Sequence, residues 1–139
     1  MNFTLVNANY DEKCGQSTVT ISTPYGHFTG VVNLHPEETY PSKYFGCDLA
    51  ETKALRLAEK ARLRELRGQL KGLRDYYFLL ADTWSFNDKD FHVKKLTSMM
   101  NDISRQIDVT KYNIRALAQS YHSKILARDK EMLKLHKGE

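Results

Sequence analysis

The side chains that most often do chemistry are too scattered in this 139-residue sequence to form a catalytic or metal motif. Its five histidines are His27, His35, His92, His122 and His136, and none pairs with another His or Cys at metal-ligand spacing. The sequence has no G-x-S-x-G nucleophile motif, and neither a G-x-G-x-x-G nor a Walker phosphate loop. We therefore expect no enzyme, no metal and no cofactor.

The two cysteines, Cys14 and Cys47, form no C-x-x-C motif. The N-terminus lacks the basic start and apolar core of an export signal, and no apolar run reaches the roughly 18 residues of a membrane span. Disulfides are rare in a reducing compartment. We therefore expect a cytoplasmic protein with two free thiols and no membrane partner.

Positive charge is concentrated in the later part of the chain. Residues 1–48 contain 2 Lys and Arg against 5 Asp and Glu (net −3), whereas residues 49–139 contain 19 against 12 (net +7). This asymmetry indicates an anionic partner, such as a nucleotide, a nucleic acid or an acidic protein. The basic side chains that share helix turns are Arg56, Lys60, Arg64, Arg67, Lys71 and Arg74, then Arg105, Lys111 and Arg115.

Aromatic and amide side chains occur close to these charges. A planar guanidinium grips phosphate, an aromatic ring stacks on a purine, and an amide reads a base or ribose edge. The aromatic residues are Tyr76, Trp84, Phe86, Phe91 and Tyr112, and the amides are Asn87, Asn101 and Asn113. The combination is compatible with nucleotide binding, but a solvated basic surface and ordinary packing of the aromatic rings explain it too.

Three strands are expected to precede the helices that carry these residues. Residues 2–8, 17–22 and 27–34 alternate in hydropathy, with Val19 and Ile21 on one face of the second strand. Thr23-Pro24-Tyr25-Gly26 has turn composition. The pattern predicts a three-stranded antiparallel meander, followed by an ordered linker over residues 35–47.

Two long helices are expected after the linker. The first runs from Leu49 to about Asp82, with Asp48 as its N-cap in a capping box with Glu51. The second runs from Lys89 to about Lys134, capped by Asn87 or Asp88. Apolar stripes recur along both at steps of three and four: Leu63, Leu66, Leu70, Leu73, Tyr77 and Leu80, then Leu96, Met100, Ile103, Ile107, Ile114, Leu117, Tyr121 and Ile125.

Helix length favours self-association. At 1.5 Å per residue the second helix would extend about 70 Å and the first about 50 Å. The small β-portion, residues 1–47, is too short to cover such a hairpin, residues 48–139. The fold class is therefore α+β, a small N-terminal antiparallel sheet followed by a long antiparallel two-helix hairpin, and we expect a homodimer or a higher homo-oligomer.

Three segments carry a resemblance to a known family. They are Thr23-Pro24-Tyr25-Gly26-His27-Phe28-Thr29-Gly30, Leu34-His35-Pro36-Glu37-Glu38 and Phe45-Gly46-Cys47-Asp48-Leu49-Ala50-Glu51. Followed by a helical hairpin, they resemble the first-described family of Thoeris anti-defence proteins of phages. The resemblance implies a non-enzymatic sponge in the bacterial host cytoplasm, which sequesters a glycocyclic ADP-ribose signal made by a TIR-domain enzyme.

The resemblance also implies a pocket near the hairpin tip, shared between protomers. The residues here that match its arginines, aromatic and asparagine are Arg67, Phe91, Asn101 and Arg105, followed by Tyr112 and Arg115. Two alternatives stay open. One is a coiled-coil protein-interaction module with no small ligand, and the other is a basic nucleic-acid-binding protein.

Overall fold

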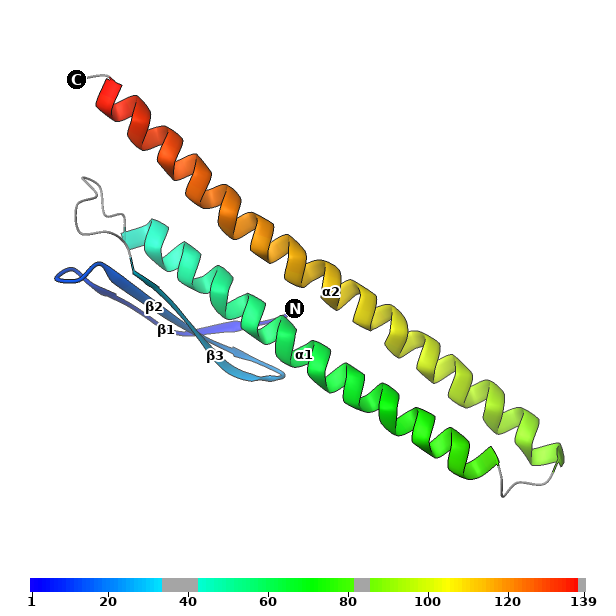
Figure 1. The fold of residues 1–139 in the computed structure, drawn as a ribbon. Helices are drawn as coiled ribbons and strands as arrows, with labels where there is room; N and C mark the ends of the chain where they lie inside the picture. The colour runs from blue at the N-terminus through cyan, green and yellow to red at the C-terminus, as the bar shows by residue number, and fades with distance from the viewer. Residues whose placement is uncertain (34–42, 82–85, 138–139) are drawn as a thin grey trace. The chain divides into compact units, whose positions relative to one another are not determined.

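The computed structural model describes residues 1–33, 43–81 and 86–137. Three strands, β1 (Thr4–Asp11), β2 (Gln16–Thr23) and β3 (Gly26–Asn33), precede two helices, α1 (Lys43–Ala81) and α2 (Phe86–Lys137) (Figure 1). The strands form one antiparallel sheet in the order β1-β2-β3. The predicted α+β class, a small sheet followed by two long helices, is confirmed.

Both turns of the meander have local reasons to form. At the first, Gly15 has a positive φ of 68°, and its N–H donates to the Asp11 carbonyl oxygen at 2.8 Å. At the second, the Thr23 hydroxyl accepts from the Tyr25 N–H at 3.1 Å and donates to the Gly26 carbonyl at 3.0 Å. Gly26 has a φ of 125°, a backbone conformation that residues with a side chain rarely adopt. The predicted second turn is confirmed.

One face of the sheet packs against α1. Val19 and Ile21 of β2 and Val32 of β3 are buried with Leu49 and with the small α1 side chains Ala50, Ala54 and Ala58. A Cβ atom added at Gly30 would overlap the Ala50 carbonyl oxygen. The missing side chain of Gly30 and the alanine face of α1 therefore allow the helix backbone to lie directly on the sheet.

The predicted helix starts are wrong by several residues. Helix α1 begins at Lys43, so Asp48 lies inside the helix and is not its N-cap. Phe45 and Cys47 pack against the core, and the Asp48 carboxylate accepts from the Lys124 ammonium at 2.9 Å. Packing of Phe45 and Cys47 and the ion pair between Asp48 and Lys124 therefore favour a helix that begins before Asp48. Helix α2 begins at Phe86, ahead of the expected caps Asn87 and Asp88. The expected linker over residues 35–47 is wrong for residues 43–47, which belong to α1, and the break expected over residues 83–87 is wrong for residues 86–87, which belong to α2. Residues 35–42 and 83–85 lie outside the described residues.

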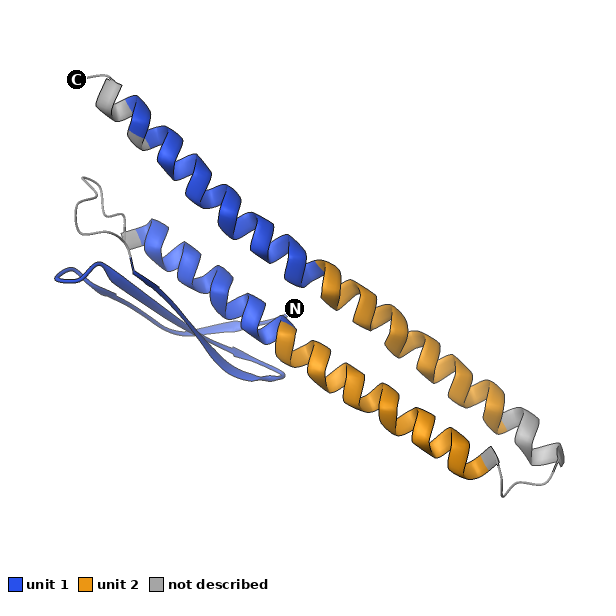
Figure 2. Ribbon diagram, viewed as in Figure 1, with its two compact units in different colours: residues 1–59, 113–139 blue, residues 60–112 orange. Residues whose placement is uncertain are grey.

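The chain divides into two compact units (Figure 2). The first comprises Met1–Glu59 and Asn113–Glu139, so it holds the sheet, the start of α1 and the end of α2. The second is Lys60–Tyr112, in which the end of α1 and the start of α2 run antiparallel.

Each unit has its own helix–helix contact. In the second unit Leu66 of α1 and Leu96 and Ile107 of α2 are buried, as their places in the apolar stripes predict. Thr110 is also fully buried, and its hydroxyl donates to the Gln106 carbonyl at 2.7 Å. In the first unit Tyr121 and Ile125 of α2 pack against the core.

Across the described part of the chain, neither helix contains a segment apolar and long enough to cross a membrane.

Candidate functional site

Three of the residues suggested by the family resemblance share one face of α2 in the second unit. Asn101, Arg105 and Tyr112 are separated by steps of four and seven residues, and all three are exposed. The Arg105 guanidinium forms an ion pair with Asp102 at 3.0 Å. The structure therefore brings the three onto one surface, and no described cavity includes them.

The other three predicted residues are dispersed. Arg67 is exposed on α1 in the second unit, and Arg115 is exposed on α2 in the first. Phe91 belongs to α2, but its side chain lies outside the described residues. Their place in a binding site stays a prediction.

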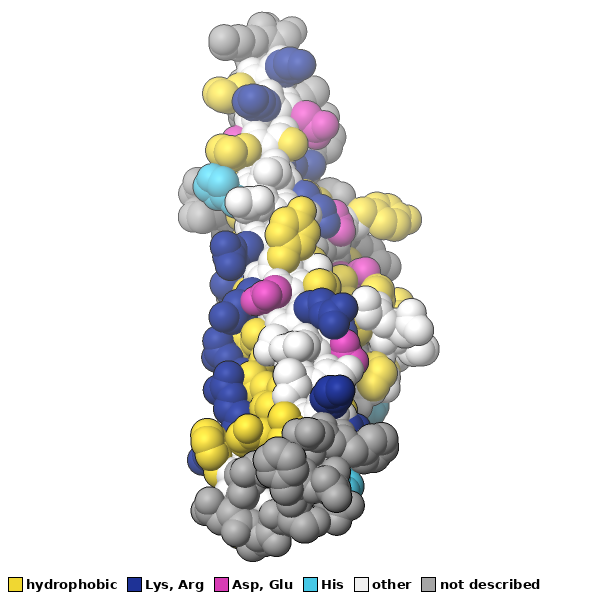
Figure 3. Space-filling view, turned by 90° about the vertical axis from the view of Figure 1, so that its right-hand side faces the viewer, with side chains coloured by type: hydrophobic (Ala, Val, Ile, Leu, Met, Phe, Trp, Pro, Cys, Tyr) yellow, Lys and Arg dark blue, Asp and Glu magenta, His cyan; other side chains and the backbone are white. Residues whose placement is uncertain are grey.

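Arg67 belongs to a row of exposed cations on α1. The row follows steps of four and three, so its members occupy one helix face: Lys60, Arg64, Arg67, Lys71 and Arg74. None of them forms an ion pair with a described residue. Figure 3 shows lysine and arginine side chains gathered beside exposed hydrophobic ones. We call these five residues the basic row.

A small cavity in the first unit combines cationic groups with an aromatic ring. It has a volume of about 230 Å³, and its lining includes Lys53 and Arg56 of α1 and Tyr121 of α2. The Lys53 ammonium lies 5.4 Å from the centre of the Tyr121 ring and donates to the Val31 carbonyl at 3.1 Å. We call this space the basic cavity.

Arg56 has unused hydrogen-bonding capacity in the basic cavity. Its Nε is buried and has no hydrogen-bond partner among the described residues. A buried donor without an acceptor is costly, and the guanidinium of an arginine that lines a cavity can pair with an anion such as phosphate. The arrangement therefore suits an anionic ligand with a flat ring, held without chemical change.

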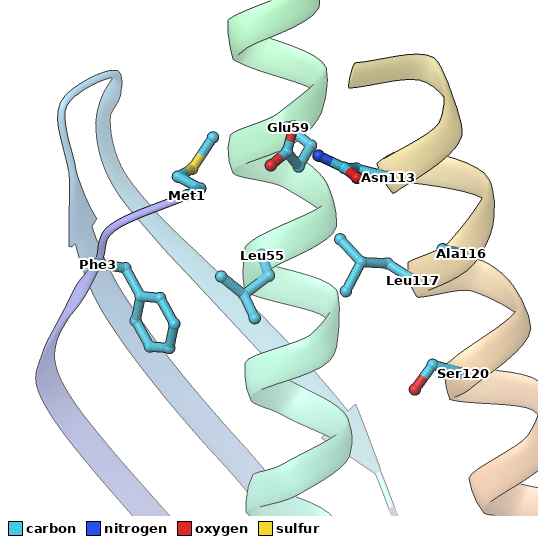
Figure 4. A pocket seen from close by; sticks show the side chains of 8 residues that line it. All are labelled: Met1, Phe3, Leu55, Glu59, Asn113, Ala116, Leu117 and Ser120. Atoms are coloured by element: carbon cyan, nitrogen blue, oxygen red, sulfur yellow. The ribbon is translucent and has the colours of Figure 1, made fainter. Parts of the chain in front are cut away.

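A second cavity has a volume of about 420 Å³ and shares the lining residue Leu117 with the basic cavity. Its polar lining residues are Glu59 of α1 and Asn113 and Ser120 of α2. Phe3, which precedes β1, also lines it (Figure 4). We call this space the Glu59 cavity.

Most residues of the two cavities are not apparent from the sequence as binding residues. Tyr121 and Leu117 belong to the predicted apolar stripe, Arg56 belongs to the basic side chains of the first helix, and Lys53 and Glu59 have no predicted role. Glu59 carries one usable signal, because it falls at the position where the apolar stripe of α1 would continue, four residues before Leu63. A charged residue in such a stripe indicates a buried polar group.

Other chemistry is sparse in the described residues. They contain no group of three His, Cys, Asp or Glu side chains that could hold a metal ion. Cys14 is an exposed free thiol and Cys47 is a half-buried one.

Comparison of the chain with protein-family models, with curated proteins and with solved structures returns no match in any of the three.

Proposed function

We propose that this protein binds a small anionic nucleotide without altering it, and so withholds that nucleotide from another protein. The observation that supports this most is the basic cavity, where Lys53 and Arg56 lie beside the Tyr121 ring. Cations neutralise phosphates, and an aromatic ring offers a surface to a base.

Sequestration needs affinity only. An enzyme must bind the transition state more tightly than the substrate, whereas a sponge must simply hold its ligand. The basic cavity provides binding groups, and the proposal requires no acid, base or nucleophile. The resemblance noted in the sequence favours a cyclic ADP-ribose signal of the glycocyclic type, and hence a counter-defence role in the host cytoplasm.

The size of the basic cavity supports a role for self-association. Its volume of about 230 Å³ is below the roughly 300–1,000 Å³ typical of small-molecule sites. We therefore propose that a second copy of the chain completes the enclosure, as in the family that the sequence resembles.

The test is calorimetric titration of the purified protein with cyclic ADP-ribose isomers and with cyclic di- and trinucleotides. One of them should bind and be recovered unchanged after heat release. Arg56→Gln should lower the affinity for that ligand by about tenfold or more, because a charge-assisted hydrogen bond is lost.

Arg105→Gln is the matched control, since Arg105 is exposed and already paired with Asp102. If Arg105→Gln abolishes binding and Arg56→Gln does not, the ligand belongs to the surface of Asn101, Arg105 and Tyr112. Chemical conversion of the nucleotide would refute sequestration.

The basic row favours nucleic-acid binding as a second candidate function. Five neighbouring cations without described ion-pair partners would follow a chain of phosphates. Such binding releases counterions and weakens steeply with salt. If no cyclic nucleotide binds, while a fluorescent oligonucleotide binds and dissociates as salt rises, this candidate replaces the first.

A further inference from the structure

Glu59 is a buried acid without a described counter-charge. Only 3% of the residue is exposed, and its Oε2 has no hydrogen-bond partner among the described residues. Figure 4 shows its carboxylate and the Asn113 amide turned toward one another across the Glu59 cavity. A carboxylate removed from water is costly unless a donor or a cation meets it. The nucleotide proposal does not use this group.

The one acidic side chain of the Glu59 cavity favours a cationic occupant. Among the described residues that line the cavity, none is Lys or Arg and Glu59 has the only charged side chain; Met1, which carries the α-amino group, lines it as well. A phosphate would meet repulsion from this carboxylate. A metal such as Mg²⁺ or Ca²⁺ prefers several oxygen ligands in a tight shell, whereas this lining is largely apolar.

We propose that the Glu59 cavity binds a small organic cation with a flat amidinium or guanidinium group. Such a group combines a positive charge with N–H donors, and both match a carboxylate. The Asn113 amide oxygen and the Ser120 hydroxyl can accept from the remaining N–H groups.

The apolar part of the cavity suits the body of such a cation. Phe3, from the segment before β1, and Leu55 of α1 both line it (Figure 4). An aromatic face attracts a cation, and the volume of about 420 Å³ is within the range of small-molecule sites. A flat aromatic amidine therefore fits both the charge and the walls.

The experiment titrates the full chain with benzamidine and with benzamide, its neutral amide counterpart, by calorimetry. Benzamidine should bind and benzamide should not. Glu59→Gln keeps the shape of the side chain but removes its charge. This variant should have an affinity for benzamidine that is lower by about tenfold or more. Glu65→Gln, a change at an exposed acid of α1, should bind benzamidine as the unmodified chain does.

A structural readout separates binding from folding. Glu59→Gln should raise the melting temperature of the ligand-free protein, because an unpaired buried charge is removed. If this variant does not fold, Ala116→Leu fills the cavity from α2 without a change of charge, and should block benzamidine.

Absence of benzamidine binding overturns the proposal, as does equal affinity in the unmodified chain and in Glu59→Gln. The inference is independent of the proposed function, because the basic cavity contains neither Glu59 nor Asn113. Loss of nucleotide binding in Arg56→Gln therefore carries no information about benzamidine.

Discussion

At the scale of single residues, glycine decides how closely α1 approaches the sheet. The Cα of Gly30 on β3 faces the backbone of Ala50 and Ala54, where no side chain fits. Gly68, in the middle of α1, has open space where its Cβ would be. The same residue type therefore has opposite consequences at the two positions.

We expect Gly30→Ala to destabilise the protein by about 3 kcal/mol, because α1 must shift away from the sheet. Gly68→Ala should instead stabilise it by about 1 kcal/mol through helix propensity. Urea unfolding followed by circular dichroism measures both. Equal stability of the two variants would contradict the close contact at Gly30.

At the scale of elements, the two helices of the second unit are joined by buried aliphatic side chains. Leu66 is 4% exposed, and Leu96 and Ile107 are nearly as buried. Val109, which belongs to α2 in the same unit, is 54% exposed. Burial, and not hydrophobicity alone, sets what each of these side chains contributes to stability.

Leu66→Ala should lower the free energy of unfolding by about 2–4 kcal/mol, since it leaves a cavity between α1 and α2. Val109→Ala, at an exposed position, should change it by less than about 0.5 kcal/mol. Thermal melting of both variants tests the assignment. A large loss of stability in Val109→Ala, with none in Leu66→Ala, would mean that the apolar stripes of the two helices are wrongly assigned.

At the scale of the whole molecule, many large hydrophobic side chains are exposed in a single copy. In the first unit they include Leu5, Val6, Tyr44, Leu57 and Leu126, and in the second Tyr76, Phe78, Leu79, Met99 and Tyr112. Where such side chains form a contiguous patch, another protein commonly covers it. A further copy of the chain is the partner that the proposed function requires.

Sedimentation equilibrium of the purified chain should give a mass that is a multiple of 16.1 kDa. The apparent mass should fall on dilution if the copies associate reversibly. A mass of one chain at all concentrations would remove self-association from the proposed function, and the basic cavity would then need to hold its ligand alone.

Prediction from the sequence succeeded where the signal is local. Strict alternation identified Val19 and Ile21 as one buried face, and the composition of residues 23–26 identified the turn. It failed at the start of α1, because the capping signal at Asp48 competes with burial of Phe45 and with the ion pair to Lys124, which is distant in the chain. The candidate site depends on the same kind of distant contact.

The sequence alone determined the element types, their order and the excess of cations on the helices, because hydropathy period, turn composition and charge are properties of neighbouring residues. Only the tertiary structure decided that Glu59 is buried beside Asn113 and that Arg56 meets Tyr121. These pairs are more than fifty residues apart, and the packing of α2 against α1 sets which helix faces meet. A helical periodicity specifies a face but not its partner, so the stripe position of Glu59 indicates burial but does not identify Asn113 as its neighbour.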